Sequence, residues 1–172
     1  MTDPDAGSGD TETDDPEYDV NFRENPEEYE VGRGEQGAFK VQPYKSELLP
    51  NWTIKTLDAG EESAETIFEQ FQQYKRDGDF VGMDMARKYL QMGYTRAMRY
   101  AKYPGGQKYE DNEAHRASNG SGETANREER EPQEWYDEEK REIALRFETK
   151  WEQVREDDKY QRLRDEHREK HG

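Results

Sequence analysis

Apolar residues recur with the period of an α-helix in the middle of the chain. From Asp58 they fall at i, i+3, i+4, i+7 and i+10, the spacing of an amphipathic helix with one buried side. The positions are Ala64, Ile67, Phe68, Phe71 and Tyr74. Asp58 or Ser63 can cap the start of this helix, and Gly78 can end it. The pattern predicts a helix from about residue 58 to residue 77.

A second helical pattern follows directly and can be capped by Asp79. One side of it carries the largely apolar set Phe80, Met83, Arg87, Leu90, Tyr94, Ala97 and Ala101, in which Arg87 can extend its aliphatic stem over the core or pair with Asp84 or Asp79. Gly82 and Gly93 cost about 1 kcal/mol each inside a helix. We therefore expect either close contact with another helix at these glycines or a break at Gly93, before residues 104–106 (Pro-Gly-Gly) end the helix.

The C-terminal quarter repeats the helical period after Pro132. One side carries Tyr136, Ile143, Phe147, Trp151 and Val154, with Trp135 beside it. Asp157 and Asp158 can start a last amphipathic helix, which includes Tyr160 and Leu163 and frays into a charged tail.

The N-terminal part has no comparable period. Residues 1–19 contain eight acids and no base, which predicts a disordered acidic tail. Residues 39–43 read as a short extended segment, and residues 44–57 as irregular chain plus a strand. Residues 110–133 have almost nothing to bury and predict a flexible insertion.

These elements predict one mainly α domain with about four helices and a minor extended N-terminal segment. We place the domain at residues 20–165, with 1–19 as the acidic tail, 110–133 as the insertion and 166–172 as a charged C-terminal tail.

Composition adds a strong charge imbalance. The 172 residues include 42 Asp and Glu against 26 Lys and Arg, and no Cys. Disulfides and thiolate chemistry are therefore excluded. No apolar run approaches the roughly 18 residues of a membrane span, and the first residues lack the features of a signal peptide, so we expect a cytoplasmic protein. The excess of acids is typical of proteins adapted to molar salt; the alternative is an ordinary acidic protein with an acidic tail.

Against this background, residues 85–109 are basic and aromatic without a single carboxylate. The candidate ligand-binding residues are Arg87, Lys88, Tyr89, Arg96, Arg99, Tyr100, Lys102, Tyr103, Lys108 and Tyr109. Bases of this kind bind phosphates, and tyrosines stack on nucleobases. The stretch predicts a binding face for nucleic acid or another phosphorylated ligand. Two alternatives remain: a protein-interaction module whose bases pair with its own or an acidic partner's carboxylates, and an enzyme acting on a phosphorylated substrate.

A glycine-rich loop precedes this region. Gly32, Arg33, Gly34 and Gly37 match G-x-G-x-x-G, the spacing of nucleotide-binding loops. The expected flanking elements are missing, because a dinucleotide fingerprint needs a hydrophobic strand before it and a helix after it, and the kinase signatures are absent. We expect a turn that binds no nucleotide; a backbone anion site remains open.

Other candidate chemistry is weaker. Asp79 and Asp84 could form a carboxylate site for a metal or for acid–base work, but helix capping and an ion pair with Arg87 or Lys88 explain the same residues. His167 and His171 share a helical face with chelating spacing, close to the C-terminal end of the given sequence. We predict no catalytic residue, no metal site and no cofactor.

The segments GRGEQGAFKVQPYKSELLPNW, DFVGMDMARKYLQMGYTRAMRYAKYPGGQKY and EDDKYQRL resemble a family of small proteins from phages, bacteria and haloarchaea, domain of unknown function 4385. The resemblance covers about residues 20–165. It implies a single domain and supplies no activity, so the functional hypotheses rest on the residues themselves.

Overall fold

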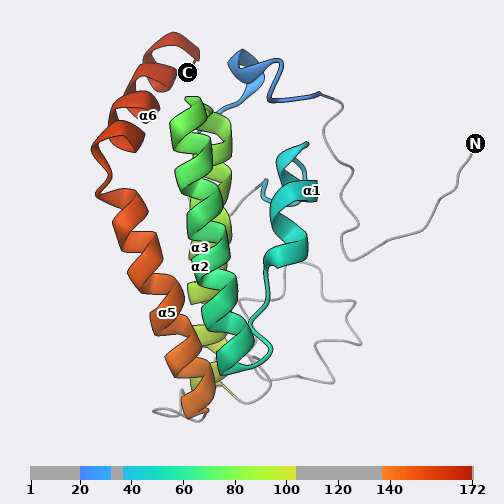
Figure 1. The fold of residues 1–172 in the computed structure, drawn as a ribbon, viewed down its shortest axis with the longest axis vertical. Coiled ribbons are helices and arrows are strands. Elements are labelled where there is room, and N and C mark those ends of the chain that lie inside the picture. Colours follow the sequence, from blue (N-terminus) through green and yellow to red (C-terminus); the bar gives the residue numbers. More distant parts are fainter. Residues whose placement is uncertain (1–19, 32–36, 104–136, 172) are drawn as a thin grey trace, which may run out of the picture.

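Helices dominate the part of the chain that the structure describes. The computed structural model describes residues 20–31, 37–103 and 137–171 (Figure 1). The α-helices are α1 (Tyr44–Leu48), α2 (Leu57–Asp77), α3 (Phe80–Lys102), α5 (Glu138–Arg155) and α6 (Asp158–His171), with 3₁₀ turns η1 (Pro26–Glu28) and η2 (Leu49–Asn51). The prediction of a mainly α protein is confirmed, with five α-helices in these residues instead of about four.

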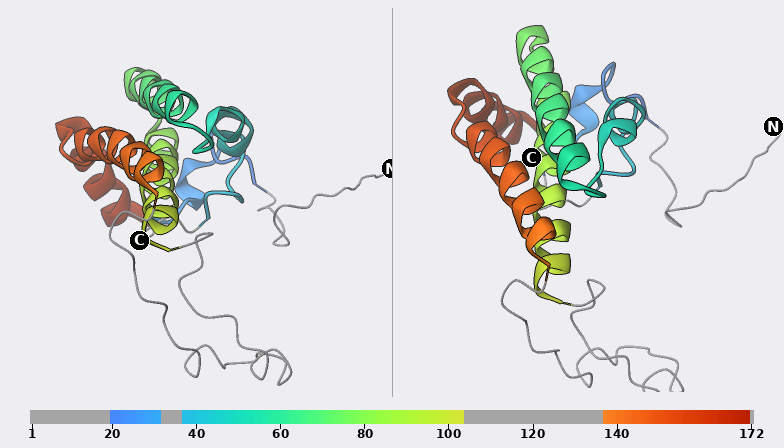
Figure 2. Two further views of the ribbon diagram at one scale, coloured as in Figure 1. Left: turned by 90° about the horizontal axis from the view of Figure 1, so that it is seen from below. Right: turned by 60° about the horizontal axis from the view of Figure 1, so that its bottom comes forward.

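The long helices α2, α3 and α5 form an antiparallel bundle. Figure 1 shows α2 in front of α3 with α5 beside them, and α6 continues from the upper end of α5. The turned views of Figure 2 show α3 enclosed by the other elements along its upper half and less covered toward its lower end. α3 contacts α1, α2, α5 and α6, which makes it the central helix.

The two helices predicted from periodicity begin and end close to the expected residues. Gly78 ends α2 with φ 69°, a left-handed conformation that favours glycine. The Asp79 carboxylate accepts a hydrogen bond from the Gly82 N–H at 3.0 Å and caps α3, as predicted. The cap of α2 was predicted wrongly: it is Thr56, whose hydroxyl accepts from the Ala59 N–H at 3.2 Å.

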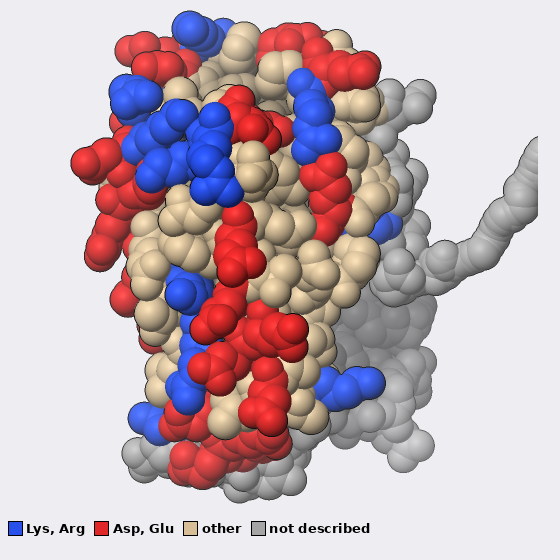
Figure 3. Space-filling model, in the orientation of Figure 1, with Lys and Arg blue, Asp and Glu red and all other residues tan. Residues whose placement is uncertain are grey.

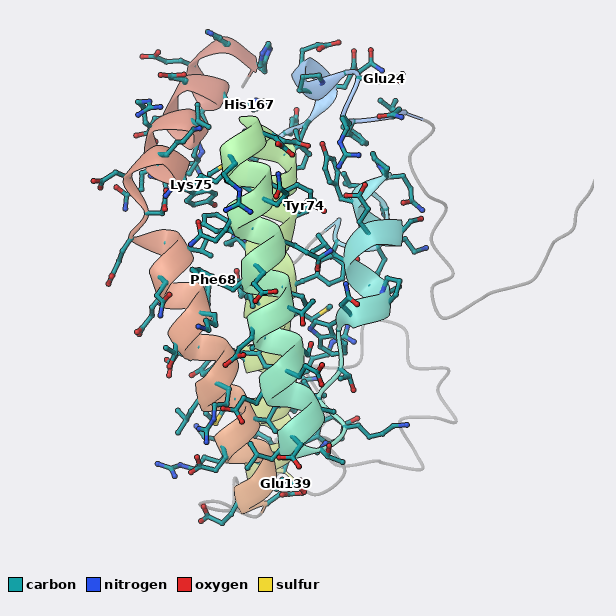
Figure 4. All side chains as sticks on the ribbon, in the orientation of Figure 1. Glu24, Phe68, Tyr74, Lys75, Glu139 and His167 are labelled. Carbon is teal, nitrogen blue, oxygen red and sulfur yellow. The ribbon has the colours of Figure 1, made fainter. Side chains whose placement is uncertain are left out.

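Both ends of α2 are also held by side chains from the C-terminal pair of helices. Glu139, labelled in Figure 4, accepts a hydrogen bond from the Leu57 N–H at 2.9 Å. At the other end Lys159 donates to the Lys75 carbonyl at 2.8 Å, and the Lys75 ammonium lies 2.5 Å from Asp157. An anion at the start of a helix and a cation at its end both interact favourably with the helix dipole.

The two glycines of α3 mark close contacts. A Cβ at Gly82 would lie 2.5 Å from the ring of Tyr74 on α2, and one at Gly93 would lie 2.2 Å from the ring of Phe147 on α5. The helix is continuous through Gly93. Close contact is therefore the correct alternative, and the break at Gly93 does not occur.

The core is rich in aromatic and methionine side chains, which compensates for the shortage of aliphatic residues. Its largest fully buried side chains are Tyr44, Tyr89, Phe71, Phe147, Leu48, Ile67, Met83, Met85, Leu90, Met92, Ile143 and Val41. Four of the twelve are aromatic, so tyrosine hydroxyls enter the interior and need hydrogen-bond partners there.

The prediction of strands in the N-terminal part is wrong. Residues 44–51 form α1 and η2, and the described residues contain only an isolated bridge between Asn21 and Gln42. Pro43 caps α1 and Pro50 lies in the first turn of η2. Proline is compatible with the start of a helix, where the N–H that it lacks has no intrahelical partner, so neither proline prevents these segments from being helical.

At the C-terminus α6 runs to His171, through most of the segment that we assigned to a charged tail. His167 is buried, and its imidazole Nε2–H donates to the Tyr29 carbonyl. Tyr29 belongs to residues 20–31, which we call the N-terminal segment. Residues 1–19 and the insertion at 110–133 lie outside the described residues. Among the described helices, none is long and apolar enough to cross a membrane.

Candidate polyanion-binding face

The predicted basic face lies on α3, but the first half of this helix is inside the protein. Every residue from Phe80 to Leu90 is buried. The helices α1, α2, α5 and α6 all contact α3, and the N-terminal segment reaches it through Tyr29, whose hydroxyl is bonded to Asp84. Arg87, Lys88 and Tyr89 are therefore interior residues.

Arg87 belongs to a buried charge cluster centred on Asp84, whose exposure is 0%. The Asp84 carboxylate accepts hydrogen bonds from Arg87 at 2.9 Å, from the Tyr160 hydroxyl at 2.6 Å and from the Tyr29 hydroxyl. We call these four residues the Asp84 cluster. It connects the N-terminal segment, α3 and α6 through one carboxylate.

The titration behaviour of the Asp84 cluster follows from its burial. Burial and the adjacent carboxylate raise the pKa of Tyr29 and Tyr160. Burial is the largest influence on Arg87 and acts to lower its pKa, but the charge and hydrogen bond of Asp84 together with Tyr160 and Tyr29 outweigh it, so the pKa is raised. Both tyrosines therefore stay neutral donors and Arg87 stays charged at any ordinary pH, which is the arrangement of a structural ion pair.

Lys88 is also interior, with 3% of its surface exposed. Its ammonium points to the end of the glycine-rich loop, because a Cβ at Gly37 would lie 3.9 Å from Nζ. Burial lowers the pKa of Lys88 to about 8, and the nearby Arg87 acts in the same direction against Asp84. Lys88 thus lies beneath the chain at Gly37 and does not belong to the exposed surface of α3.

Tyr89 contacts the segment that runs from Ala38 to Trp52. Its hydroxyl donates to the Ala38 carbonyl at 2.9 Å, and its own carbonyl accepts from the Trp52 indole N–H at 3.0 Å. Its ring also meets Phe39 edge to face, with 6.2 Å between the centroids. Tyr89 therefore fixes the positions of Phe39 and Trp52 next to the second half of α3.

The second half of α3 carries the exposed part of the predicted face. Arg96, Arg99, Tyr100 and Lys102 are exposed, and we call these four the α3 basic face. Among the described residues no ion pair joins any of the three bases to a carboxylate. Their charge is thus available to a ligand, while the helix C-terminus favours cations at this position.

Aromatic rings surround these bases. The Arg96 guanidinium lies 5.7 Å from the centroid of Phe39 and 5.8 Å from that of Trp52, within the range of cation–π contact. Tyr100 is 41% exposed and is the one large apolar side chain exposed in the described ranges. The Lys140 ammonium lies 5.6 Å from its ring centroid.

The other predicted ligand-binding residues are placed as follows. Tyr103 is buried at the end of α3. Gly37 has φ 86° and lies next to Lys88. Lys108, Tyr109, Gly32, Arg33 and Gly34 lie outside the described residues.

The acidic face of the molecule is a different surface. Exposed acids follow α2 at Asp58, Glu61, Glu62, Glu65 and Glu69. Figure 3, which looks onto the α2 side, shows acidic side chains gathered over the lower part of the bundle. The α3 basic face thus lies on a different helix from this row of acids.

Asp79 belongs to a second polar network, at the junction of α2 and α3. Tyr44 donates to Asp79 at 2.7 Å, and Arg23 bridges Asp79 at 3.2 Å and Glu47 at 2.8 Å. Tyr74 donates to Glu47 at 2.6 Å and points toward α1 in Figure 4. The hydrogen bond from Arg23 is the main cause that holds the pKa of Glu47 below its usual value, against its partial burial. This network fastens the N-terminal segment to the bundle.

Neither carboxylate has the surroundings of a metal or acid–base site. Asp79 caps α3 and accepts from Tyr44, and Asp84 is enclosed by its three donors. No group of three or more potential metal ligands occurs in the described ranges. His167 and His171 lie with ring centroids 4.8 Å apart, but Nε2 of His167 is occupied by the Tyr29 carbonyl.

The sequence analysis did not identify Phe39 and Trp52 as part of the candidate site. They are 57 and 44 positions away from Arg96 in the sequence, and no local periodicity links them to α3. The available signal was composition, because both are aromatic residues in a segment without a clear helical or strand pattern.

The fold and its charges thus describe a small antiparallel helical domain with one exposed basic and aromatic face. The chain belongs to the family described as domain of unknown function (DUF4385), whose model matches residues 12–170. No curated protein and no solved structure matches the chain.

Proposed function

We propose that this domain binds a polyanion, namely nucleic acid or another phosphate-bearing polymer, through the α3 basic face. The observation that carries the proposal is the solvent exposure of Arg96, Arg99 and Lys102 without an ion pair to any described carboxylate. In a protein with 42 acids and 26 bases, a helix face whose three bases meet no described carboxylate is an arrangement that a phosphate ligand would explain.

The geometry supports this function over the two alternatives. A protein-interaction surface is expected to expose an apolar patch, whereas Tyr100 is the one large apolar residue exposed in the described ranges. An active site needs convergent polar groups that can contact a substrate, whereas the carboxylates of Asp79 and Asp84 already accept structural hydrogen bonds. An acidic partner protein remains the alternative that the test below separates.

The test is the binding of labelled oligonucleotides and of inorganic polyphosphate, measured by fluorescence anisotropy and by competition at graded KCl. Arg99→Glu should weaken binding of both by about tenfold or more and reduce the salt dependence. Arg162→Glu is the matched control, because Arg162 is an exposed base on α6 that is 3.8 Å from Glu166. Equal, weak binding by all three proteins would refute the proposal and favour a protein partner.

We also propose that the acidic surface is an adaptation to a salt-rich cytoplasm. The support is the net charge of −16 together with the exposed acids along α2. A polyanion binder in molar salt loses much of its electrostatic attraction, so it needs contacts other than charge.

A further inference from the structure

We infer that the ligand of the α3 basic face is single-stranded nucleic acid, and that Arg96 and Tyr100 form a stacking platform for its bases. The inference rests on the proposed function and goes beyond it, because phosphate attraction alone does not distinguish a single strand from a duplex or from polyphosphate. The stacking surfaces beside these bases make that distinction, because only exposed bases can stack on them.

The Arg96 guanidinium is held over two aromatic rings. Phe39 and Trp52 lie at 5.7 Å and 5.8 Å from its Cζ, and Arg96 remains exposed. A guanidinium is planar and weakly hydrated, so it can lie on an aromatic ring and present its opposite face to a nucleobase. Arg96 backed by aromatic rings is therefore a flat cationic surface for a base.

The platform is fixed in advance by buried contacts. The Trp52 indole donates to the Tyr89 carbonyl at 3.0 Å, Phe39 packs edge to face on the Tyr89 ring, and the Tyr89 hydroxyl is bonded to Ala38. Tyr89 itself has 0% exposure. A rigid surface loses little conformational entropy when a ligand binds, so the platform is preorganised by a positioning residue, Tyr89, that does not touch the ligand.

Tyr100 provides a second stacking surface one helical turn further along. Residues at i and i+4 lie about 5–6 Å apart on a helix surface, so Arg96 and Tyr100 face the same side. Lys140, 5.6 Å from the Tyr100 ring centroid, also donates to the Ile54 carbonyl at 2.5 Å and is thereby held beside the ring. Arg99 lies between the two stacking residues in sequence and can meet the connecting phosphate.

Stacking also answers the problem of salt. Counterion release weakens phosphate contacts steeply as salt rises, whereas base–aromatic stacking contributes about 1–3 kcal/mol per base and involves no counterion. A single strand exposes its bases for stacking, and a duplex or polyphosphate does not. We therefore expect the preference for a single strand to grow as KCl is raised.

The test compares charge-conserving variants against three probes: a single-stranded oligothymidine, a duplex of the same length and inorganic polyphosphate. Arg96→Lys keeps the charge and removes the planar group. Arg99→Lys makes the same change at a base that has no cation–π contact with a ring of the described residues. Tyr100→Leu removes a ring that Tyr100→Phe retains. Circular dichroism confirms that each variant is folded.

Arg96→Lys and Tyr100→Leu should each weaken single-strand binding by about fivefold or more. The loss should be smaller for Arg99→Lys than for Arg96→Lys and smaller for Tyr100→Phe than for Tyr100→Leu, because the removed planar group is backed by rings only at Arg96 and the ring is kept in Tyr100→Phe. Polyphosphate, which has no bases to stack, should not show these two differences. If polyanions bind but the two lysine variants behave alike, or the duplex binds as tightly as the single strand at every KCl concentration, the platform is wrong and the proposed function stands. If no probe binds at all, both are wrong.

Discussion

The two halves of α3 carry similar bases in opposite surroundings. In the first half, residues 80–90, Arg87 and Lys88 are buried, and Arg87 is neutralised by Asp84 at 2.9 Å. In the second half, residues 91–102, Arg96, Arg99 and Lys102 face solvent. The difference arises because Tyr29 of the N-terminal segment and Tyr160 of α6 pack onto the first half at Asp84, whereas the bases of the second half are exposed. Figure 2 shows the described elements gathered around the upper part of α3. The bases of the first half of α3 are thus part of the interior, and those of the second half form the candidate binding surface.

The largest effect is expected when the buried half is broken at Asp84. Asp84→Ala leaves the buried Arg87 without its counter-ion and removes the acceptor of Tyr29 and Tyr160. The loss of a partner from a buried ion pair costs about 3–5 kcal/mol. Urea denaturation should show this decrease in the free energy of unfolding.

Arg99→Ala in the exposed half is the matched comparison for Asp84→Ala. Surface substitutions away from special features change stability by within about 0.5 kcal/mol. Equal destabilisation by the two variants would contradict the division of α3 into an interior and an exposed half.

Gly93→Ala tests the packing of the second half against α5. The added Cβ would lie 2.2 Å from the Phe147 ring, and overpacking typically costs about 1–3 kcal/mol. Thermal denaturation should show a lower melting temperature. Gly93→Ala combined with Phe147→Leu should lose less than the sum of the single changes; strict additivity would mean that the ring is not the obstacle.

Lys88 gives the buried half of α3 a dependence of stability on pH. Its pKa is lowered from 10.5 to about 8 by burial, so between pH 8 and pH 10 the unfolded chain binds more protons than the folded protein. Stability therefore rises with pH across this window, on the order of 2 kcal/mol. Above about pH 10 the raised pKa values of Tyr29 and Tyr160 act in the opposite direction, because the unfolded tyrosines ionise first.

Urea denaturation between pH 8 and pH 10 measures this effect. Lys88→Met should flatten the profile. A wild-type profile that is already flat would show that Lys88 keeps its ordinary pKa.

The smallest effect is expected from salt, which should act on the exposed charges and not on the buried ion pair. Raising KCl from 0.1 M to 1 M shortens the Debye length from about 10 Å to about 3 Å, which relieves repulsion among the exposed acids. The melting temperature of wild type should rise over the molar range, and the difference between wild type and Asp84→Ala should not change. A melting temperature that is constant in KCl would remove the main support for adaptation to salt.

Much of the helical framework could be predicted from local patterns. The stripe from Ala64 to Tyr74 predicted the buried side of α2, and Gly78 and Asp79 marked the boundary between α2 and α3. These features act over a few residues and are readable in sequence. Residues 44–57 were not, because short apolar runs around a proline fit a strand, a turn and a short helix equally well.

The candidate site was predictable only in part. The sequence identified the bases and tyrosines, but their exposure depends on tertiary contacts such as Lys88 with Gly37 and Tyr89 with Ala38. A 3.6-residue period does not predict which polar side of a central helix another segment will cover. Arg96 and Arg99 are distinguished from Arg87 by the packing of distant segments, which no local pattern encodes.

The attachment of α2 at both ends has a consequence for how the length of the chain can vary. Glu139 holds the first turn of α2 and Lys159 holds its last. One inserted or deleted residue in α2 would shift one end by about 1.5 Å and turn it by about 100°, which would misplace Tyr74 over Gly82 as well as the Lys75 carbonyl. The length of α2 must therefore match the distance between its two attachment points, Glu139 and Lys159. An insertion in either one is tolerated only with a compensating change in the other.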